Sequence, residues 1–339
     1  MRRLVVFFCL VFLAGAVAAE TDRATFISFA TSLVKVEAVD PEGRYHLGTG
    51  VTVALGTVIT NCHVTRYAQR IRLVKGGLPY AVESEWSDLA HDVCLLYSSR
   101  FEAVPVALGA ADKLRLGQKV AAIGFTGGLK LQVREGKVEG LYRYDGARVI
   151  QTSTAFSSGA SGGGLFDEEG RLVGILTYRL RGANGYYFST PVEWFASNIA
   201  DRSQYKRVRP LLGAEPFWQG TQDSLPYFMR ASSLASDKRW TDIVQLTERW
   251  SSAEADSAEP WFARGTAYEN LHRSDAAIKA YRQAVTLDPH HSLAWFNLGR
   301  LYEMSGETGG VRDAREKLRD LDTELFQQLL SEGKENARQ

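Results

Sequence analysis

The stretch Gly159-Ala160-Ser161-Gly162-Gly163-Gly164 places a serine among glycines, and the interpretation of the chain starts there. A serine alcohol attacks an amide at neutral pH only when a base accepts its proton and a carboxylate orients that base. Two earlier stretches carry such groups, Thr60-Asn61-Cys62-His63-Val64 and His91-Asp92-Val93-Cys94-Leu95-Leu96. Together the three stretches predict a nucleophile at Ser161, a general base at His63 and an orienting acid at Asp92.

Short β-rich runs surround these stretches from about residue 33 to residue 190. Turn residues separate the runs, and no helical periodicity lies between them, which is typical of antiparallel barrels or sandwiches. Leu116-Gly117-Gln118 divides the runs into two sets, with His63 and Asp92 in the first set and Ser161 in the second. We therefore expect two β-barrels with the site in the cleft between them.

Several of these segments resemble the trypsin-like serine proteases, and more closely their bacterial HtrA-like (Deg) branch, over about residues 25–200. The matching pieces are Gly48-Thr49-Gly50-Val51, Val58 to Val64, Asp92 to Leu96, Gln151-Thr152, Gly159 to Phe166 and Gly170 to Ile175. The resemblance implies an all-β double barrel with a Ser161-His63-Asp92 triad. It also implies an oxyanion hole formed by the main-chain amides of Gly159 and Ser161.

The specificity pocket is placed by the same resemblance. It would involve Ala155, Thr177, Tyr178, Arg179 and Tyr186. Because Ala155 offers no carboxylate at the pocket floor, a small or medium apolar substrate side chain is expected rather than Arg or Lys. The residue before the nucleophile, Ala160, departs both from the aspartate of digestive enzymes and from the usual asparagine of HtrA-like enzymes, so zymogen-type activation is not expected.

The first 19 residues have the features of a secretory signal peptide. Met1-Arg2-Arg3 is positive, Leu4 to Leu13 is apolar, and Ala16-Val17-Ala18 offers small residues for cleavage. The alternative is an uncleaved anchor helix, although the apolar run is short for a membrane span. We expect a periplasmic or secreted protein without stable membrane insertion after cleavage.

Cleavage would remove Cys9 and leave Cys62 and Cys94 as a potential disulfide in an oxidising compartment. Residues two apart in a strand share a face, so the contact that brings Asp92 to His63 also brings Cys94 near Cys62. A Cys62–Cys94 disulfide is expected, with two reduced core cysteines as the alternative.

A different pattern follows a polar linker at residues 201–223. The stretch Pro260 to Glu269 recurs as Ala294 to Glu303, and its Trp, Phe, Gly, Tyr and Glu each return after 34 residues. That period is typical of tetratricopeptide (TPR) repeats, which are stacked helix pairs. We expect an all-α region at residues 224–331 with repeats at about 225–258, 259–292 and 293–330, a capping helix at 312–330 and a disordered tail at 332–339.

Composition limits the function classes. The 339 residues carry a formal charge of +1 with both signs interspersed, which argues against nucleic-acid binding. No cluster shows metal-ligand spacing, so neither a metal nor a cofactor is expected. The predicted function is an exported serine endopeptidase that hydrolyses peptide bonds of polypeptide substrates. The predicted protease domain spans residues 20–200, and the repeats are expected to recruit a substrate or protein partner.

Two alternatives remain open at this level. One is a catalytically inert adaptor whose TPR repeats mediate protein–protein interaction, and the other is a hydrolase of small esters that uses the same triad. The sequence leaves the natural substrate and the oligomeric state open.

Overall fold

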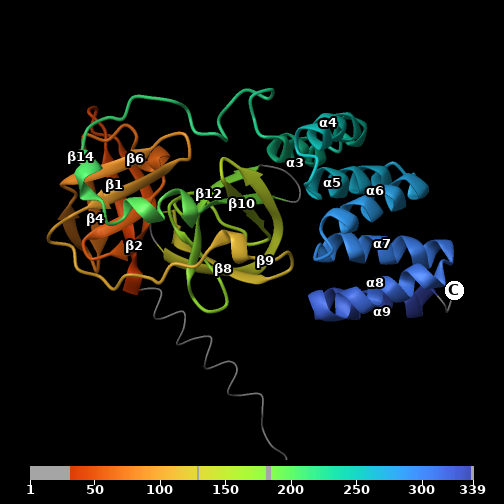
Figure 1. The fold of residues 1–339 in the computed structure, drawn as a ribbon. Helices are drawn as coiled ribbons and strands as arrows, with labels where there is room; N and C mark the ends of the chain where they lie inside the picture. Colours follow the sequence, from red (N-terminus) through yellow and green to blue (C-terminus); the bar gives the residue numbers. More distant parts are fainter. Residues whose placement is uncertain (1–30, 128–129, 181–184, 337–339) are drawn as a thin grey trace, which may run out of the picture.

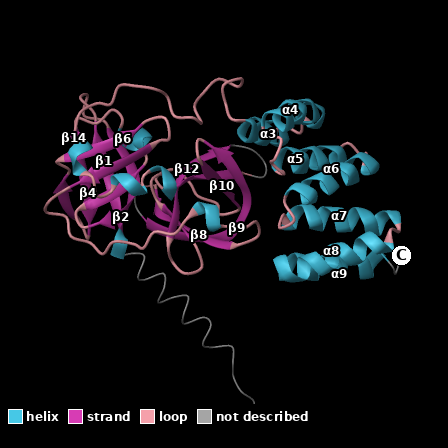
Figure 2. Ribbon diagram, in the orientation of Figure 1, coloured by secondary structure: helices cyan, strands magenta, loops and turns pink. Residues whose placement is uncertain are grey.

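The computed structural model describes residues 31–127, 130–180 and 185–336, in which a β-rich part precedes a stack of helices (Figure 1). Strands lie between residues 33 and 207, and the long helices lie between 227 and 336 (Figure 2). The expected signal peptide at residues 1–19 lies outside the described residues. None of the helices in the described ranges is both long and apolar enough to cross a membrane.

The first half of the β-rich part is an eight-stranded antiparallel sheet. Its order is β14-β6-β7-β3-β2-β1-β4-β5, formed by β1 (Leu33–Val39), β2 (Tyr45–Ala54), β3 (Thr57–Thr60), β4 (Arg70–Lys75), β5 (Leu78–Ala81), β6 (Ser84–Asp88), β7 (Val93–Tyr97) and β14 (Lys206–Arg207). Alternate residues of β1, Val34, Val36 and Ala38, are fully buried, which fixes the face that it turns to the core.

This sheet is a half-barrel rather than the closed barrel that the sequence predicted, because β14 and β5 form its two free ends. The short strand β5 contains Pro79, which has no N–H to donate to a further strand and so suits an edge.

The second half is the closed barrel that was predicted. Its order is β10-β13-β12-β11-β8-β9, formed by β8 (Lys119–Thr126), β9 (Lys130–Tyr144), β10 (Ala147–Thr152), β11 (Gly164–Phe166), β12 (Leu172–Leu180) and β13 (Tyr186–Pro191). Ile59 and Leu95 of the first half share one buried apolar cluster with Ile123 and Phe166 of the second. The two halves are therefore packed against each other.

Short helical turns connect these strands. They are α2 (Cys62–Thr65) and the 3₁₀ turns η1 (Ala111–Lys113), η2 (Val192–Trp194), η3 (Ala196–Asn198) and η4 (Arg202–Gln204). The two consecutive turns η2 and η3 end the β-rich part before the segment that leads to the helices.

Helix pairs follow, as the 34-residue period predicted. They are α3 (Tyr227–Ser236) with α4 (Trp240–Ala253), α5 (Glu259–Asn270) with α6 (Ser274–Leu287), and α7 (Ser292–Ser305) with α8 (Thr308–Leu321). A Cβ on Gly265 would lie 2.6 Å from a ring carbon of Tyr281, so glycine lets α5 and α6 approach closely.

The C-terminal end differs from the prediction in two respects. The expected capping helix is split at Asp322, whose Oδ1 accepts hydrogen bonds from the amides of Glu324 (3.0 Å) and Leu325 (3.1 Å) and so starts α9 (Thr323–Asn336). The tail predicted to be disordered from residue 332 continues α9 to Asn336. Fully buried Leu329 anchors this helix, and Glu332 lies 3.4 Å from Arg300 Nε.

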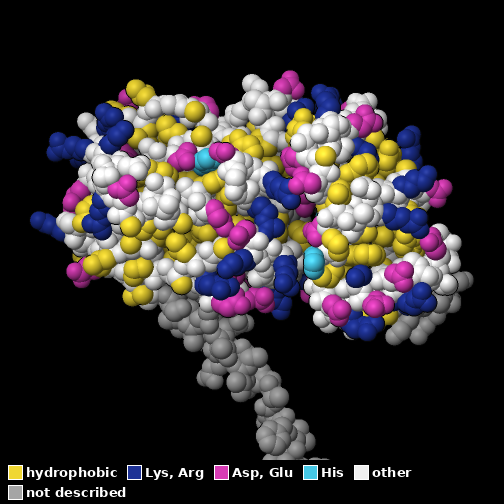
Figure 3. Space-filling view, in the orientation of Figure 1, with side chains coloured by type: hydrophobic (Ala, Val, Ile, Leu, Met, Phe, Trp, Pro, Cys, Tyr) yellow, Lys and Arg dark blue, Asp and Glu magenta, His cyan; other side chains and the backbone are white. Residues whose placement is uncertain are grey.

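The helices lie against the second barrel. The ring of Phe228 in α3 stacks on Tyr142 of β9 at 4.6 Å and 8°. Two exposed ion pairs span the same interface, Arg143–Asp256 at 2.5 Å and Lys137–Glu324 at 2.8 Å. On the face in Figure 3, basic and acidic side chains are intermingled over both parts of the molecule.

Candidate active site

The first half of the molecule brings His63 and Asp92 together. Asp92, in the turn before β7, has a left-handed backbone (φ 60°), a conformation that aspartate tolerates better than most residues. Its Oδ2 lies 2.6 Å from His63 Nδ1, and its Oδ1 accepts a 2.7 Å hydrogen bond from the main-chain N–H of His63. Asp92 is 1% exposed. This geometry fixes both the position of the imidazole ring and the nitrogen that faces the acid.

Asn61 and a disulfide stabilise the contact between His63 and Asp92. Asn61 Nδ2 donates to the main-chain oxygen of Asp92 at 3.0 Å and to Thr177 Oγ1 at 3.0 Å, which links the two halves of the molecule. Cys62 and Cys94 form a disulfide with a Cα–Cα distance of 5.0 Å, as predicted. The cross-link joins the residue before His63 to the strand that follows Asp92.

The loop that carries Ser161 packs against the same region. Gly162 has φ +82°, and a Cβ there would collide with the main-chain oxygen of Thr49. A Cβ on Gly48 would lie 2.7 Å from Val64 Cγ1 and 3.1 Å from the main-chain oxygen of Ser161. The segment that carries His63 and the loop that carries Ser161 therefore both pack against β2 at Gly48, where a larger residue would collide with them.

The main chain before Ser161 has the features of an anion site. Gly159 has φ +93°, and the carbonyl of Ser158 accepts a 2.8 Å hydrogen bond from Gly127 N–H. Because the C=O and N–H of a trans peptide point in opposite directions, the N–H of Gly159 is turned away from Gly127. No described group accepts a hydrogen bond from the amides of Gly159 or Ser161.

Thr49 is a supporting residue that the sequence analysis missed. Its Oγ1 donates to the carbonyl of Gly159 at 2.8 Å and accepts from the N–H of Phe125 at 2.8 Å, while its own N–H donates to the carbonyl of Ser161 at 2.8 Å. The resemblance already included Thr49, but nothing local indicated that its hydroxyl joins the two halves.

Replacing Thr49 with Val is expected to lower the free energy of unfolding by about 1–3 kcal/mol and kcat by about tenfold, because the half-buried carbonyl of Gly159 and N–H of Phe125 lose their partner. Chemical denaturation and peptide hydrolysis measure the two effects. Thr52→Val is the matched control, since the buried Thr52 hydroxyl on the same strand has no hydrogen-bond partner within residues 31–127, 130–180 and 185–336. Equal losses in the two variants would contradict the role given to Thr49.

The residues expected to line the specificity pocket are not all in one place. Ala155 is exposed, and Tyr178 and Arg179 are half-buried in β12. Thr177 is buried, and its hydroxyl is engaged by Asn61 and by the carbonyl of Ile175 at 2.8 Å. Tyr186 packs instead into the aromatic cluster shared with α3.

Tyr187, the next residue in β13, lies on the opposite face of the strand from Tyr186. The ring of Tyr187 lies 5.2 Å from that of Phe156, the residue after Ala155. Tyr187 is therefore closer than Tyr186 to the expected pocket floor.

The linker supplies a second group that the sequence analysis missed. Trp218 Nε1 donates a 3.0 Å hydrogen bond to Asp92 Oδ2, and the indole ring lies edge-on to His63 at 5.4 Å. The available signal was Phe217-Trp218 in an otherwise polar stretch, because two large aromatic side chains need a surface to cover them.

His91, next to Asp92, belongs to a separate ion-pair cluster. Its Nδ1 lies 2.6 Å from Asp88 Oδ2 and its Nε2 lies 2.8 Å from Asp145 Oδ2. Burial disfavours the charged imidazole, but the hydrogen bond and charge of Asp88, assisted by Asp145, outweigh burial and raise the pKa of His91. Its ring stacks on Trp194 at 4.0 Å.

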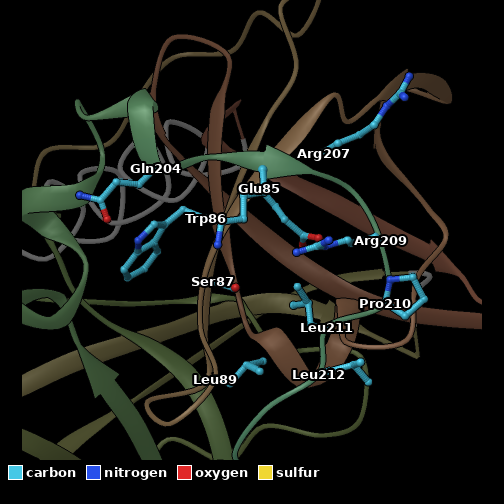
Figure 4. A pocket seen from close by; sticks show the side chains of 11 residues that line it. Glu85, Trp86, Ser87, Leu89, Gln204, Arg207, Arg209, Pro210, Leu211 and Leu212 are labelled. Atoms are coloured by element: carbon cyan, nitrogen blue, oxygen red, sulfur yellow. The ribbon is translucent and has the colours of Figure 1, made fainter.

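A cavity of about 630 Å³ lies between β6, β14 and the start of the linker (Figure 4). None of its lining residues is His63, Asp92 or Ser161. Its wall includes Glu85, which is 3% exposed and whose carboxylate oxygens have no hydrogen-bond partner among the described groups. Burial raises the pKa of Glu85 to about 7, and the nearby main chain of Arg209 only partly offsets this.

Glu85→Gln is expected to stabilise the protein increasingly as the pH rises from about 4.5 to about 7. The folded state retains the Glu85 proton that the unfolded chain loses, so wild-type stability falls across this window and is unaffected below it. The gain above pH 7 should be about 1–3 kcal/mol, measured by denaturation at pH 4 and pH 8. Glu83→Gln, at an exposed neighbouring position bonded to Ser99, should show no such gain.

Comparisons with known proteins agree with this architecture. Residues 48–175 match the family described as a trypsin-like peptidase domain, and residues 258–291 and 280–315 match tetratricopeptide repeat families. The structure of the active form of the Rv3671c protease from M. tuberculosis superposes with a TM-score of 0.51 over 63% of this chain and 99% of that one. Its 19% identity supports the fold alone.

Relatives are found over the β-rich part. A probable periplasmic serine endoprotease DegP-like of Halomonas elongata is 32% identical over 170 residues, covering 48% of this chain and 36% of the relative. Protease Do-like 1, chloroplastic, of Arabidopsis thaliana is 33% identical over 173 residues, covering 47% and 39%. The chain thus matches less than half the length of these relatives.

The β-rich part is therefore a trypsin-like peptidase domain. Its relatives include serine proteases of the HtrA/DegP type, and in this chain the domain is followed by tetratricopeptide repeats.

Proposed function

We propose that this chain is a serine endopeptidase that hydrolyses peptide bonds of polypeptide substrates through Ser161, His63 and Asp92. The observation that carries the proposal is the buried Asp92 carboxylate 2.6 Å from His63 Nδ1. The glycine-flanked serine loop and the segment that carries His63 both pack against Gly48 of β2. The match to a peptidase family and to serine endoproteases supports the same chemistry.

In the proposed reaction, Ser161 Oγ attacks the substrate carbonyl while His63 Nε2 accepts its proton. Asp92 keeps the other imidazole proton on Nδ1 and stabilises the cation that forms. The amides of Gly159 and Ser161 bind the negative oxygen of the tetrahedral intermediate. His63 then protonates the leaving amine, and water releases the acyl group from Ser161 by the reverse sequence.

Substrate selection and recruitment complete the proposal. Without a carboxylate at Ala155, the pocket takes a small or medium apolar side chain. The repeats recruit a substrate or protein partner, because stacked helix pairs offer an extended surface for polypeptides. The signal-like residues 1–19 and the periplasmic name of the Halomonas relative support export to the periplasm or beyond.

The test is labelling of the purified full chain with a fluorophosphonate, followed by casein and small-ester turnover. Label on the wild type and casein cleavage support an endopeptidase. An unlabelled wild type would favour an inert adaptor, and turnover restricted to esters would favour an esterase.

A further inference from the structure

We propose that Trp218, in the segment between the two domains, is a positioning residue of the active site, and that its indole N–H holds the Asp92 carboxylate in the orientation that His63 requires. The inference rests on the proposed function. It adds to the site a residue outside the β-rich part, about 30 positions beyond its last barrel strand.

The carboxylate of Asp92 receives hydrogen bonds from three directions. His63 contributes two donors, its main-chain N–H to Oδ1 at 2.7 Å and its Nδ1 to Oδ2 at 2.6 Å. Trp218 Nε1 contributes the third, to Oδ2 at 3.0 Å. The donor from Trp218 is independent of His63, so it keeps the plane of the carboxylate fixed while the imidazole gains and loses its proton.

The indole ring also closes the site around the acid. It meets the His63 ring edge-on at 5.4 Å and 86° and stacks on Tyr178 at 5.0 Å and 22°. Asp92 is only 1% exposed in this setting. A charge–charge interaction between acid and base is stronger when water is kept out, so the ring contributes beyond its hydrogen bond.

Thr177 of β12 is linked to Asp92 through Asn61, which donates both to the Thr177 hydroxyl and to the main-chain oxygen of Asp92. In the described part of the chain, the Thr177 hydroxyl does not donate to the Asp92 carboxylate. That hydroxyl donates to the carbonyl of Ile175 at 2.8 Å instead. Among the described residues, the Asp92 carboxylate is bonded only to His63 and Trp218.

The segment that carries Trp218 is fixed to the peptidase domain. We call residues 211–218 the strap. The main-chain carbonyl of Arg66, the residue that follows α2, accepts a 2.7 Å hydrogen bond from the N–H of Leu211. The Arg66 guanidinium donates to the carbonyls of Gly213 (3.0 Å) and Ala214 (3.2 Å). Glu215 adds an ion pair with Arg66 at 3.1 Å.

The other end of the strap is held as well. Phe217 N–H donates to the carbonyl of Ala90 at 2.9 Å, two residues before Asp92. The Phe217 ring packs 5.2 Å from Tyr144 and 5.7 Å from Trp194. The strap is thus bonded to the peptidase domain at both ends, near His63 and near Asp92. These contacts fix the position of Trp218 beside the Asp92 carboxylate.

The test is Trp218→Phe in the full chain, assayed for peptide hydrolysis from pH 5 to pH 9. The variant keeps an aromatic ring and removes the N–H. We expect kcat to fall about tenfold with little change in KM, since one hydrogen bond to a charged group is lost.

The pH dependence of kcat/KM distinguishes this role from a purely structural one, because a structural role of Trp218 would leave the acid limb unchanged. Without the N–H dipole, more of the Asp92 negative charge acts on the protonated imidazole, so the acid limb of the kcat/KM profile should shift to higher pH by about half a unit. The other charged groups close by are His91, Asp88 and Asp145, and they remain unchanged in the variant.

Trp194→Phe is the matched control. It removes an indole N–H from the same aromatic neighbourhood, where Trp194 Nε1 donates to the carbonyl of Asp145 at 3.0 Å without touching the triad. This control should keep the wild-type acid limb. Replacement of Trp218 by the isosteric amino acid benzothienylalanine, which has sulfur in place of N–H, provides a second variant if Trp218→Phe fails to fold.

Three outcomes overturn the inference. Wild-type kcat and acid limb in both Trp218 variants would show that the N–H is dispensable. An equal shift in Trp194→Phe would make the effect non-specific. A higher kcat/KM in Trp218→Ala would show that the ring obstructs the cleft. An inactive wild-type chain, in contrast, would overturn the proposed function itself.

Discussion

Ser161→Ala is expected to lower kcat for peptide hydrolysis by about 10⁶-fold, because no other group in the site can form the acyl-enzyme. KM should change little, since the substrate contacts of the cleft remain. Fluorophosphonate labelling should be lost completely. A coupled assay with a fluorogenic peptide measures the rate, and gel fluorescence measures the label.

The stability of this variant separates chemistry from folding. Ser161 contacts Thr49 through its main-chain oxygen, which the substitution leaves in place at 2.8 Å. Thermal unfolding should therefore match the wild type. Ser158→Ala, at an exposed position three residues earlier in the same loop, serves as the control and should retain activity and label. Peptide cleavage that survives Ser161→Ala would assign the nucleophile to another residue.

Asp92→Asn is expected to lower kcat by about 10⁴-fold, because the imidazole is then held in the wrong tautomer. All three donors around Asp92 point at the carboxylate, two at Oδ2 and one at Oδ1. An amide has one acceptor oxygen, so its NH₂ group must face a donor. If it faces His63 Nδ1, the imidazole carries its proton on Nε2 and cannot accept one from Ser161.

The readout is kcat at pH 8, together with circular dichroism to confirm folding. Asp88→Asn is the control, because Asp88 is the same residue type four positions earlier and is bonded to His91 rather than His63. We expect its kcat to stay within about threefold of the wild type. Activity within tenfold of the wild type in Asp92→Asn would exclude Asp92 from the role proposed for it.

The parts of the fold that sequence predicted well are those set by local chemistry. The 34-residue period identified the helix pairs because each repeat buries the same aromatic and small residues. The Cys62–Cys94 disulfide was predicted correctly, but strand alternation is not its cause, because Asp92 lies in the turn before β7. The pairing of Cys94 with Thr60 of β3 brings the two cysteines together.

The parts that it missed depend on the arrangement of distant segments. The pairing of β12 with β13 is shifted between Leu176 and Tyr178, and an offset of one residue reverses the face on which a side chain lies. This is why Tyr186 packs toward α3 and Tyr187 toward Phe156. The sequence predicts only a linker around Trp218, since no local pattern shows which surface a pair of aromatic residues will cover.

The stacking of Phe228 on Tyr142 joins the first helix pair to the second barrel through a shared apolar cluster. The exposed ion pairs beside it weaken in salt, but an aromatic contact does not, so the alignment persists at high ionic strength. If the helices capture a polypeptide as proposed, the captured segment would be held at a fixed distance from Ser161. Only substrates with a long enough flexible segment beyond the captured part would then reach the proposed nucleophile, so the length of that segment would contribute to substrate selection.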